Sequence, residues 1–77
     1  MTSYTVKKVS GTCQAINVDT NQVVCSEGNE VVVGGNTYTV LKRPSDQVCC
    51  IYKVIPAHGG NPESFEQVCQ EGQIVQA

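Results

Sequence analysis

Residues Glu30 to Leu41 read EVVVGGNTYTVL, and this stretch decides the fold. The valines of its first part and the Thr-Tyr-Thr-Val of its second part favour extended backbone, because branching at Cβ restricts χ1 and crowds a helix. Gly34 and Gly35 lie between the two runs. They suit a two-residue hairpin turn, whose backbone requires positive φ. We therefore predict a β-hairpin centred on this glycine pair.

The glycine pair also sets the strand register of this hairpin. The predicted cross-strand pairs are Val33 with Asn36, Val32 with Thr37, and Val31 with Tyr38. The residues predicted to share one face are Val31, Val33, Tyr38 and Val40, with Thr37 and Thr39 on the other. A turn at Gly35-Asn36 would instead slip the register and exchange the faces. A phosphate-binding loop is disfavoured, because a strand and not a helix follows the glycines.

The length and composition indicate one small domain over residues 1–77. So short a chain buries only about 60% of its unfolded surface. With one Phe and no Trp, its core is thin, and disulfides, a metal or oligomerisation usually support such domains. The net charge of −2 and the pI of about 5.1 disfavour a nucleic-acid partner. No apolar run is long enough to span a membrane, and we expect no cofactor.

Four further strands are predicted from alternating or continuous apolar patterns. They cover Ser3–Val9, Cys13–Val18, Gln22–Ser26 and Gln47–Ile55. A loop at Thr20-Asn21 sets the register of the second and third of them. The pairs that it predicts are Val18 with Val23 and Ile16 with Cys25. The fourth strand is apolar on both faces apart from Lys53, so we expect it to be central in a sheet or covered on both faces. We find no internal repeat and no low-complexity segment.

The segment near residues 62–71 has two interpretations. In the first it is a short helix, with Asn61 as N-cap, Pro62 in the first turn and Gly72 beyond the end. Its buried face would hold Phe65, Val68 and Cys69. In the second it is a closing hairpin, with strands at Ser64–Gln70 and Gln73–Gln76 around a Glu71-Gly72 turn. The predicted fold class is therefore mainly β: a small single-domain antiparallel β-barrel or β-sandwich of six to eight short strands, with or without this helix.

The segment Pro56–Glu63 contains two prolines and two glycines, and we predict that it is a contact loop. It holds His58, the only histidine. A Cys-His nucleophilic pair requires an orienting group and an oxyanion site, and no motif places a cysteine beside this histidine. The seven acidic residues are scattered over turns and strand ends, so no pair is placed for acid/base catalysis. We therefore predict no catalytic residue and no enzyme activity.

The cysteines are candidates for disulfide bonding or for burial as thiols. They are Cys13, Cys25, Cys49, Cys50 and Cys69. No Cys-x-x-Cys pair occurs among them, so no metal site is expected. In one interpretation all five are reduced and act as small buried hydrophobic side chains. In the other, two disulfides, made by Cys13, Cys25, Cys69 and one of the adjacent pair, brace the core and leave one cysteine over.

These features predict a non-enzymatic structural or assembly protein that binds protein partners in a homo- or hetero-oligomer. By fold-level analogy, an accessory component of a phage or virus particle fits this description. It would dock by an edge strand or by an apolar Val/Tyr face. The alternative is a secreted, disulfide-stapled binding module such as an inhibitor, toxin or effector. The N-terminal MTSYTVKKVS has no apolar signal segment, so we expect synthesis in the cytoplasm. An assembly protein would then be located in the virion. The binding module would be secreted if a leader was removed.

Overall fold

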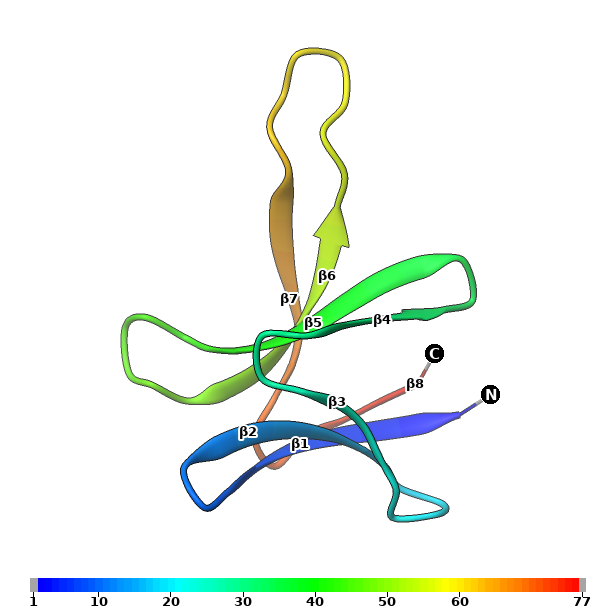
Figure 1. Ribbon diagram of the computed structural model, residues 1–77, viewed down its shortest axis with the longest axis vertical. Helices are drawn as coiled ribbons and strands as arrows, with labels where there is room; N and C mark the ends of the chain where they lie inside the picture. Colours follow the sequence, from blue (N-terminus) through cyan, green and yellow to red (C-terminus); the bar gives the residue numbers. More distant parts are fainter. Residues whose placement is uncertain (1, 77) are drawn as a thin grey trace.

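The computed structural model describes residues 2–76, and over this range the protein is all-β with no helix (Figure 1). Its strands are β1 (Ser3–Val9), β2 (Thr12–Asn17), β3 (Val23–Ser26), β4 (Glu30–Val33), β5 (Asn36–Lys42), β6 (Cys49–Ile55), β7 (Ser64–Gln70) and β8 (Ile74–Gln76). The prediction of a mainly β domain with antiparallel pairing is confirmed.

The strands form two four-stranded sheets. The first has the order β3-β2-β1-β8 and the second the order β4-β5-β6-β7. No pairing among residues 2–76 closes either sheet into a barrel. Side chains from both sheets meet in one core, to which the first sheet contributes Val6 and Ala15 and the second Val40 and Ile51. The core thus lies between the sheets and contains small aliphatic side chains and cysteines.

The central hairpin has the predicted register. Val33 pairs with Asn36, Val32 with Thr37, and Val31 with Tyr38. Gly34 and Gly35 have φ angles of 59° and 83°, which glycine adopts without the steric cost of a Cβ atom. The predicted central position of β6 is also confirmed, since this strand lies between β5 and β7. It begins at Cys49 and not at Gln47, because Gln47 has a φ of 62° and belongs to the preceding turn.

The predicted register of β2 and β3 is wrong. Ile16 pairs with Val23 and Ala15 pairs with Cys25, so Val24 is the extra residue of a β-bulge. The turn begins at Asn17, earlier than expected, because the Oδ1 atom of Asn17 accepts hydrogen bonds from the backbone N–H groups of Asp19 and Thr20. An asparagine in this role ends a strand.

The helix interpretation of residues 62–71 is wrong. The strand β7 occupies Ser64–Gln70, as the hairpin interpretation predicted. A short isolated helix gains little in water, whereas β6 offers a long strand edge to pair with. The closing hairpin itself does not form, however, because β8 pairs with β1 in the other sheet. The chain therefore crosses between the sheets after β7, as it does after β3.

The two sheets are built alike, which corrects the expectation that the sequence holds no repeat. We call residues 3–33 (β1 to β4) the first half and residues 36–76 (β5 to β8) the second half. Each sheet contains the first three strands of one half and the fourth strand of the other, in the same order. Tyr-Thr-Val occurs at residues 4–6 and 38–40, and Val-Cys-x-Glu-Gly at residues 24–28 and 68–72. The bulge recurs as well, with Val68 in the place of Val24.

Unequal loops hide this repeat in the sequence. Cys25 follows Cys13 by 12 positions, whereas Cys69 follows Cys49 by 20. Most of the additional residues of the second half lie between β6 and β7, and the others lie between β5 and β6. A fixed period therefore never appears, although the strands match one by one.

A hydrogen bond of Thr39 links the second half to the first, and a substitution at this residue tests how much the link contributes to stability. Its hydroxyl donates to the carbonyl of Asn29 at 2.8 Å, and its side chain is only 4% exposed. We expect Thr39→Val to lower the free energy of unfolding by about 1 kcal/mol, since valine keeps the volume and loses the hydrogen bond. Thr5→Val is the matched control, because the equivalent hydroxyl of Thr5 binds the carbonyl of Gln73 at a half-buried position where water can replace it. Urea unfolding should show the smaller loss for Thr5→Val, and the reverse order would contradict a buried link at Thr39.

Candidate functional site

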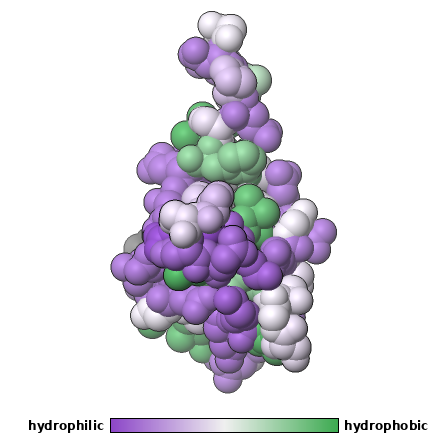
Figure 2. Space-filling view, turned by 90° about the vertical axis from the view of Figure 1, so that its left-hand side faces the viewer, coloured by the Kyte–Doolittle hydropathy of each residue, from purple (hydrophilic) through white to green (hydrophobic). Residues whose placement is uncertain are grey.

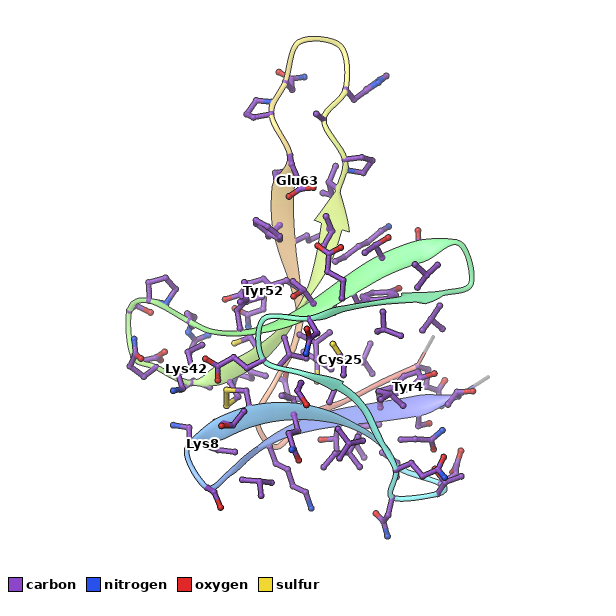
Figure 3. All side chains as sticks on the ribbon, in the orientation of Figure 1. Tyr4, Lys8, Cys25, Lys42, Tyr52 and Glu63 are labelled. Carbon is purple, nitrogen blue, oxygen red and sulfur yellow. A yellow bond between two sulfur atoms is a disulfide. The ribbon has the colours of Figure 1, made fainter. Side chains whose placement is uncertain are left out.

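A disulfide between Cys13 and Cys49 joins the two sheets. Cys13 lies on β2 and Cys49 on β6, with their Cα atoms 5.5 Å apart. Both residues are fully buried. Figure 3 shows the yellow sulfur–sulfur bond between the sheets, close to Lys8 and Lys42. The bridge therefore joins two strands that no backbone ladder connects.

Each bridged cysteine is bound by a glutamate that follows the third strand of its own half. The backbone N–H of Cys13 donates to Oε1 of Glu27 at 3.0 Å, and that of Cys49 donates to Oε1 of Glu71 at 2.9 Å. In return the backbone N–H of each glutamate donates to the carbonyl of the same cysteine. Lys42 lies 3.9 Å from the carboxylate of Glu27. These paired bonds fix both ends of the bridge and satisfy backbone groups at the strand ends.

The other cysteines are buried thiols: Cys25, Cys50 and Cys69. Cys25 donates to the carbonyl of Asn29 at 3.1 Å and Cys69 donates to that of Gln73 at 3.3 Å. Burial raises the pKa of both thiols above their ordinary value. Thiols in such a place stay protonated at neutral pH and are weak nucleophiles. The structure thus contains one bridge, and not the two of the oxidised interpretation.

Cys50 lies on the face of β6 opposite to Cys49 and Ile51, under a polar cluster. Arg43 donates to the side-chain oxygens of Gln67 and Gln70, and its Nε donates to Asp46 at 2.9 Å. Gln70 is the direct cross-strand neighbour of Cys50. The hydrogen bond from Arg43 lowers the pKa of the Asp46 carboxyl. This cluster closes the face of the sheet over a fully buried thiol.

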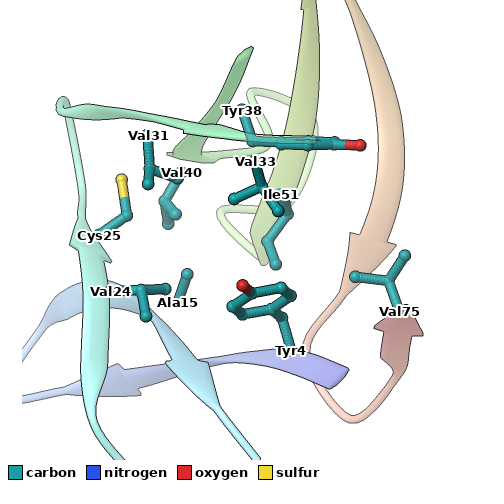
Figure 4. Close-up of a pocket in the computed structure, with 10 residues that line it drawn as sticks. All are labelled: Tyr4, Ala15, Val24, Cys25, Val31, Val33, Tyr38, Val40, Ile51 and Val75. Atoms are coloured by element: carbon teal, nitrogen blue, oxygen red, sulfur yellow. The ribbon is translucent and has the colours of Figure 1, made fainter. Parts of the chain in front are cut away.

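A small cavity lies in the core between the sheets, with a volume of about 30 Å³ (Figure 4). It is lined by Tyr4, Ala15, Val24, Cys25, Val31, Val33, Tyr38, Val40, Ile51 and Val75. A space of this size holds one water molecule at most, and an apolar lining offers that water no partner. The cavity is therefore a packing gap of the thin core and no candidate ligand site.

The hairpin of β6 and β7 projects from the body as an arm, at the top of Figure 1. We define the arm as residues 54–66, because the matching strands of the first half, β2 and β3, turn at the equivalent positions. The predicted contact loop Pro56–Glu63 forms its tip. There His58 and Asn61 exchange two backbone hydrogen bonds, of 3.0 and 2.9 Å. The tip is exposed throughout.

An apolar row crosses the outer face of the second sheet at the base of the arm. Cross-strand pairing runs from Val32 through Thr37 and Val54 to Phe65. The ring of Phe65 meets that of Tyr52 edge to face, with centroids 6.5 Å apart. We call Val32, Val54, Phe65 and Tyr52 the outer stripe. Figure 2 shows hydrophobic patches where the narrow arm meets a largely hydrophilic body.

Two residues of the outer stripe are more exposed than a folding role requires, whereas Val54 is buried. Val32 is 68% exposed and Phe65 is 49% exposed. The positions of the first half that match Val32 and Phe65 are Gln76 and Asn21, which are both polar. Val32 and Phe65 are therefore apolar in one half alone, whereas Tyr52 and Val54 match the apolar residues Ile16 and Val18 of the first half. The sequence indicated the loop through its prolines and glycines but gave no sign of the stripe, whose residues become neighbours only through the strand pairing.

The remaining candidates from the sequence lie apart. His58 is at the tip of the arm, whereas the cysteines lie in the sheets. Within residues 2–76, no three or more His, Cys, Asp or Glu side chains are grouped so as to hold a metal ion. Over the same range, no helix could cross a membrane. Comparison with protein-family models, with curated proteins and with solved structures finds no match to this chain.

The disulfide should contribute a large share of the stability. It closes a loop with a sequence separation of 36 residues. We expect the double variant Cys13→Ala/Cys49→Ala to lose about 2–4 kcal/mol in free energy of unfolding, because the unfolded chain regains the entropy that the bridge removes. Urea unfolding measures this loss. The reduced wild-type chain is the control and should lose a similar amount, and an unchanged free energy of unfolding in either would contradict a structural role.

Proposed function

We propose that this chain is a non-enzymatic interaction protein, in which a disulfide-braced scaffold presents the arm and the outer stripe to a protein partner. One observation supports this proposal above the others: the halves match strand by strand, and the arm with its stripe is the largest departure from that match. Matched parts serve a fold that both halves share. An unmatched, exposed and partly apolar addition costs stability without serving that fold, which is typical of a binding element.

The scaffold suits this purpose because it is rigid where the arm begins. The bridge at Cys49 and the buried residues Cys50 and Ile51 anchor the start of β6 in the core. β6 then continues outward into the arm. We take the two sheets as an open β-sandwich and not a barrel, since each has free edge strands. An anchored strand that leaves the body keeps the arm preorganised for binding.

The side chains of the arm specify what kind of partner would fit. The stripe supplies apolar contact and an aromatic pair, which are frequent anchors of protein interfaces. A surface groove beside the arm includes Glu30 and Glu63 in its lining, with Lys53 as its basic residue. Lys53 lies directly opposite Glu66 on the neighbouring strand, which offsets its positive charge. The groove therefore keeps an excess of negative charge from Glu30 and Glu63. The partner would present an apolar patch flanked by basic side chains.

A larger assembly is the setting that we propose for this contact. An accessory protein of a phage or virus particle is one example, and in that case the chain would be found in the virion. In such an assembly one copy docks by its stripe on a neighbouring subunit. Symmetry then repeats the contact around the particle.

Grafting within the chain tests the role of the arm. Residues 53–66 are replaced by Asn17–Gln22, the turn that occupies the same place in the first half. We expect the grafted protein to keep its disulfide and to melt within a few degrees of the wild type, because the scaffold keeps its most deeply buried side chains. Partner capture by cross-linking in extracts of the source, read by quantitative mass spectrometry, should fall at least tenfold.

Two point variants distinguish the effect of the stripe from that of losing any exposed apolar side chain. Phe65→Ser should weaken capture of the same partner, whereas Val23→Ser should not. Val23 is the matched control, since it is 50% exposed and lies on the first sheet. A partner that binds the grafted protein and Phe65→Ser as tightly as the wild type would contradict the proposal.

The disulfide favours a second candidate, an exported binding module such as an inhibitor, toxin or effector. Structural disulfides persist in oxidising compartments and rarely in the cytosol. In this candidate the stapled core replaces the hydrophobic area that a short chain lacks, and the arm inserts into its target.

Counting the free thiols of the protein in its native source tests whether it is located in an oxidising compartment. Thiols are blocked with iodoacetamide at lysis under denaturing conditions, and the intact mass is measured. The exported candidate predicts three blocked cysteines before reduction and five after it, as the bridge and the three thiols of the structure require. Five blocked cysteines before reduction would rule this candidate out.

A further inference from the structure

The likeness of the halves extends to individual hydrogen bonds. The hydroxyl of Thr5 donates to the carbonyl of Gln73 at 2.7 Å, and that of Thr39 donates to the carbonyl of Asn29 at 2.8 Å. Both bonds run from one half to the other, in opposite directions. The hydrogen bonds of Glu27 and Glu71 to the bridged cysteines match too, and each of these lies within one half. The disulfide itself joins Cys13 to its own counterpart.

Neither half is complete without the other. The fourth strand of the first half, β4, finds its partner in β5, and the fourth strand of the second half, β8, finds its partner in β1. The core is shared too, because Val6 and Val40 occupy matching positions and are both almost fully buried in one cluster. A contact in which each side offers the same elements to the other is isologous, as in a two-fold homodimer.

We infer that the chain consists of two copies of one folding unit, and that the surface between them is a self-association surface that can accept the complementary half of a second copy of this chain. The backbone connection between the halves is the Gly34-Gly35 turn. Two copies that open this turn can exchange halves. The strand pairs and core contacts between the halves form again between the chains, those within a half stay within one chain, and only the turn is lost.

This inference is independent of the binding role of the arm, because the exchanged surface lies between the sheets and the arm projects from one of them. The disulfide reports on the exchange. In the closed monomer Cys13 and Cys49 belong to one chain, whereas in the exchanged dimer each bridge joins two chains. Oxidised glutathione in the buffer forms the bridge: two cysteine thiols lose two protons and two electrons, and the glutathione disulfide becomes two reduced glutathiones.

Deletion of Gly34 and Gly35 from the full chain tests the inference. Without these residues Val33 and Asn36 would have to form the turn, which requires positive φ at a β-branched valine and so strongly disfavours the hairpin between β4 and β5. We expect the deleted chain, refolded with oxidised glutathione, to run as a covalent dimer of twice the monomer mass on a non-reducing gel and as a monomer after reduction. Peptide mapping should find Cys13 linked to Cys49. Insertion of two further glycines after Gly35 should leave the protein monomeric.

A matched deletion inside one half is the control. Ser10 and Gly11 form the turn between β1 and β2, so Cys13 and Cys49 both lie after this deletion and move together if β1 is exchanged. Deletion of these two residues should give no bridge between chains, whether or not β1 is exchanged. A deleted Gly34-Gly35 chain that is monomeric with an internal bridge, or that forms no Cys13–Cys49 bridge at all, would overturn the inference.

The wild-type chain provides the second measurement, which does not depend on the folding of a variant. Equal amounts of ¹⁵N-labelled and unlabelled protein are reduced, unfolded and refolded together with oxidised glutathione. At millimolar concentration we expect bridged peptides that contain one labelled and one unlabelled partner, and at micromolar concentration their share should fall at least tenfold. Absence of mixed bridges at both concentrations would overturn the inference.

Discussion

Each sheet of this protein is completed by a strand from the other half of the chain. This constraint decides most of the structure. β8 must return to β1 and β4 must reach β5, so the chain crosses between the sheets twice, after β3 and after β7. Each crossing carries the Glu-Gly pair whose glutamate binds a bridged cysteine. The crossings, the glutamate hydrogen bonds and the disulfide are therefore parts of one arrangement, and the disulfide adds a link between the halves of a thin core.

The same arrangement separates scaffold from function. Positions that agree between the halves are those that the fold needs: the Tyr-Thr-Val strands, the bulge valines and the Val-Cys-x-Glu-Gly crossings. Positions that disagree are free of that need. The arm and the exposed stripe residues Val32 and Phe65 fall in this second group. The arm starts from a buried strand, so its base is held firmly while its tip stays open to solvent. The two halves of one chain can thus be compared with each other, as two relatives would be.

Local signals predicted most of the strands but few of their long-range partners. The glycine pair fixed one hairpin because its turn geometry acts within four residues. The register of β2 and β3 failed because the side chain of Asn17 started the turn early, an effect that apolar patterns do not contain. The helix interpretation of residues 62–71 depended on local signals alone, namely the cap residues and the spacing of Phe65, Val68 and Cys69, since the pairing partner of β7 was unknown. The stripe could not be foreseen for the same reason: its members are far apart in the sequence. The repeat was visible in two short motifs, but loops of unequal length concealed it.

The pairing of Ser3 with Gln76 also constrains how the protein is made. A ribosome adds about 5–20 residues per second, so β1 is synthesised roughly 4–15 s before β8. During that time β2 and β3 can pair with β1, but the sheet has an open edge and the apolar side of Val6 lacks its cover. Folding of the first sheet therefore ends only after translation of residue 76, because its edge strand is the last strand to be made.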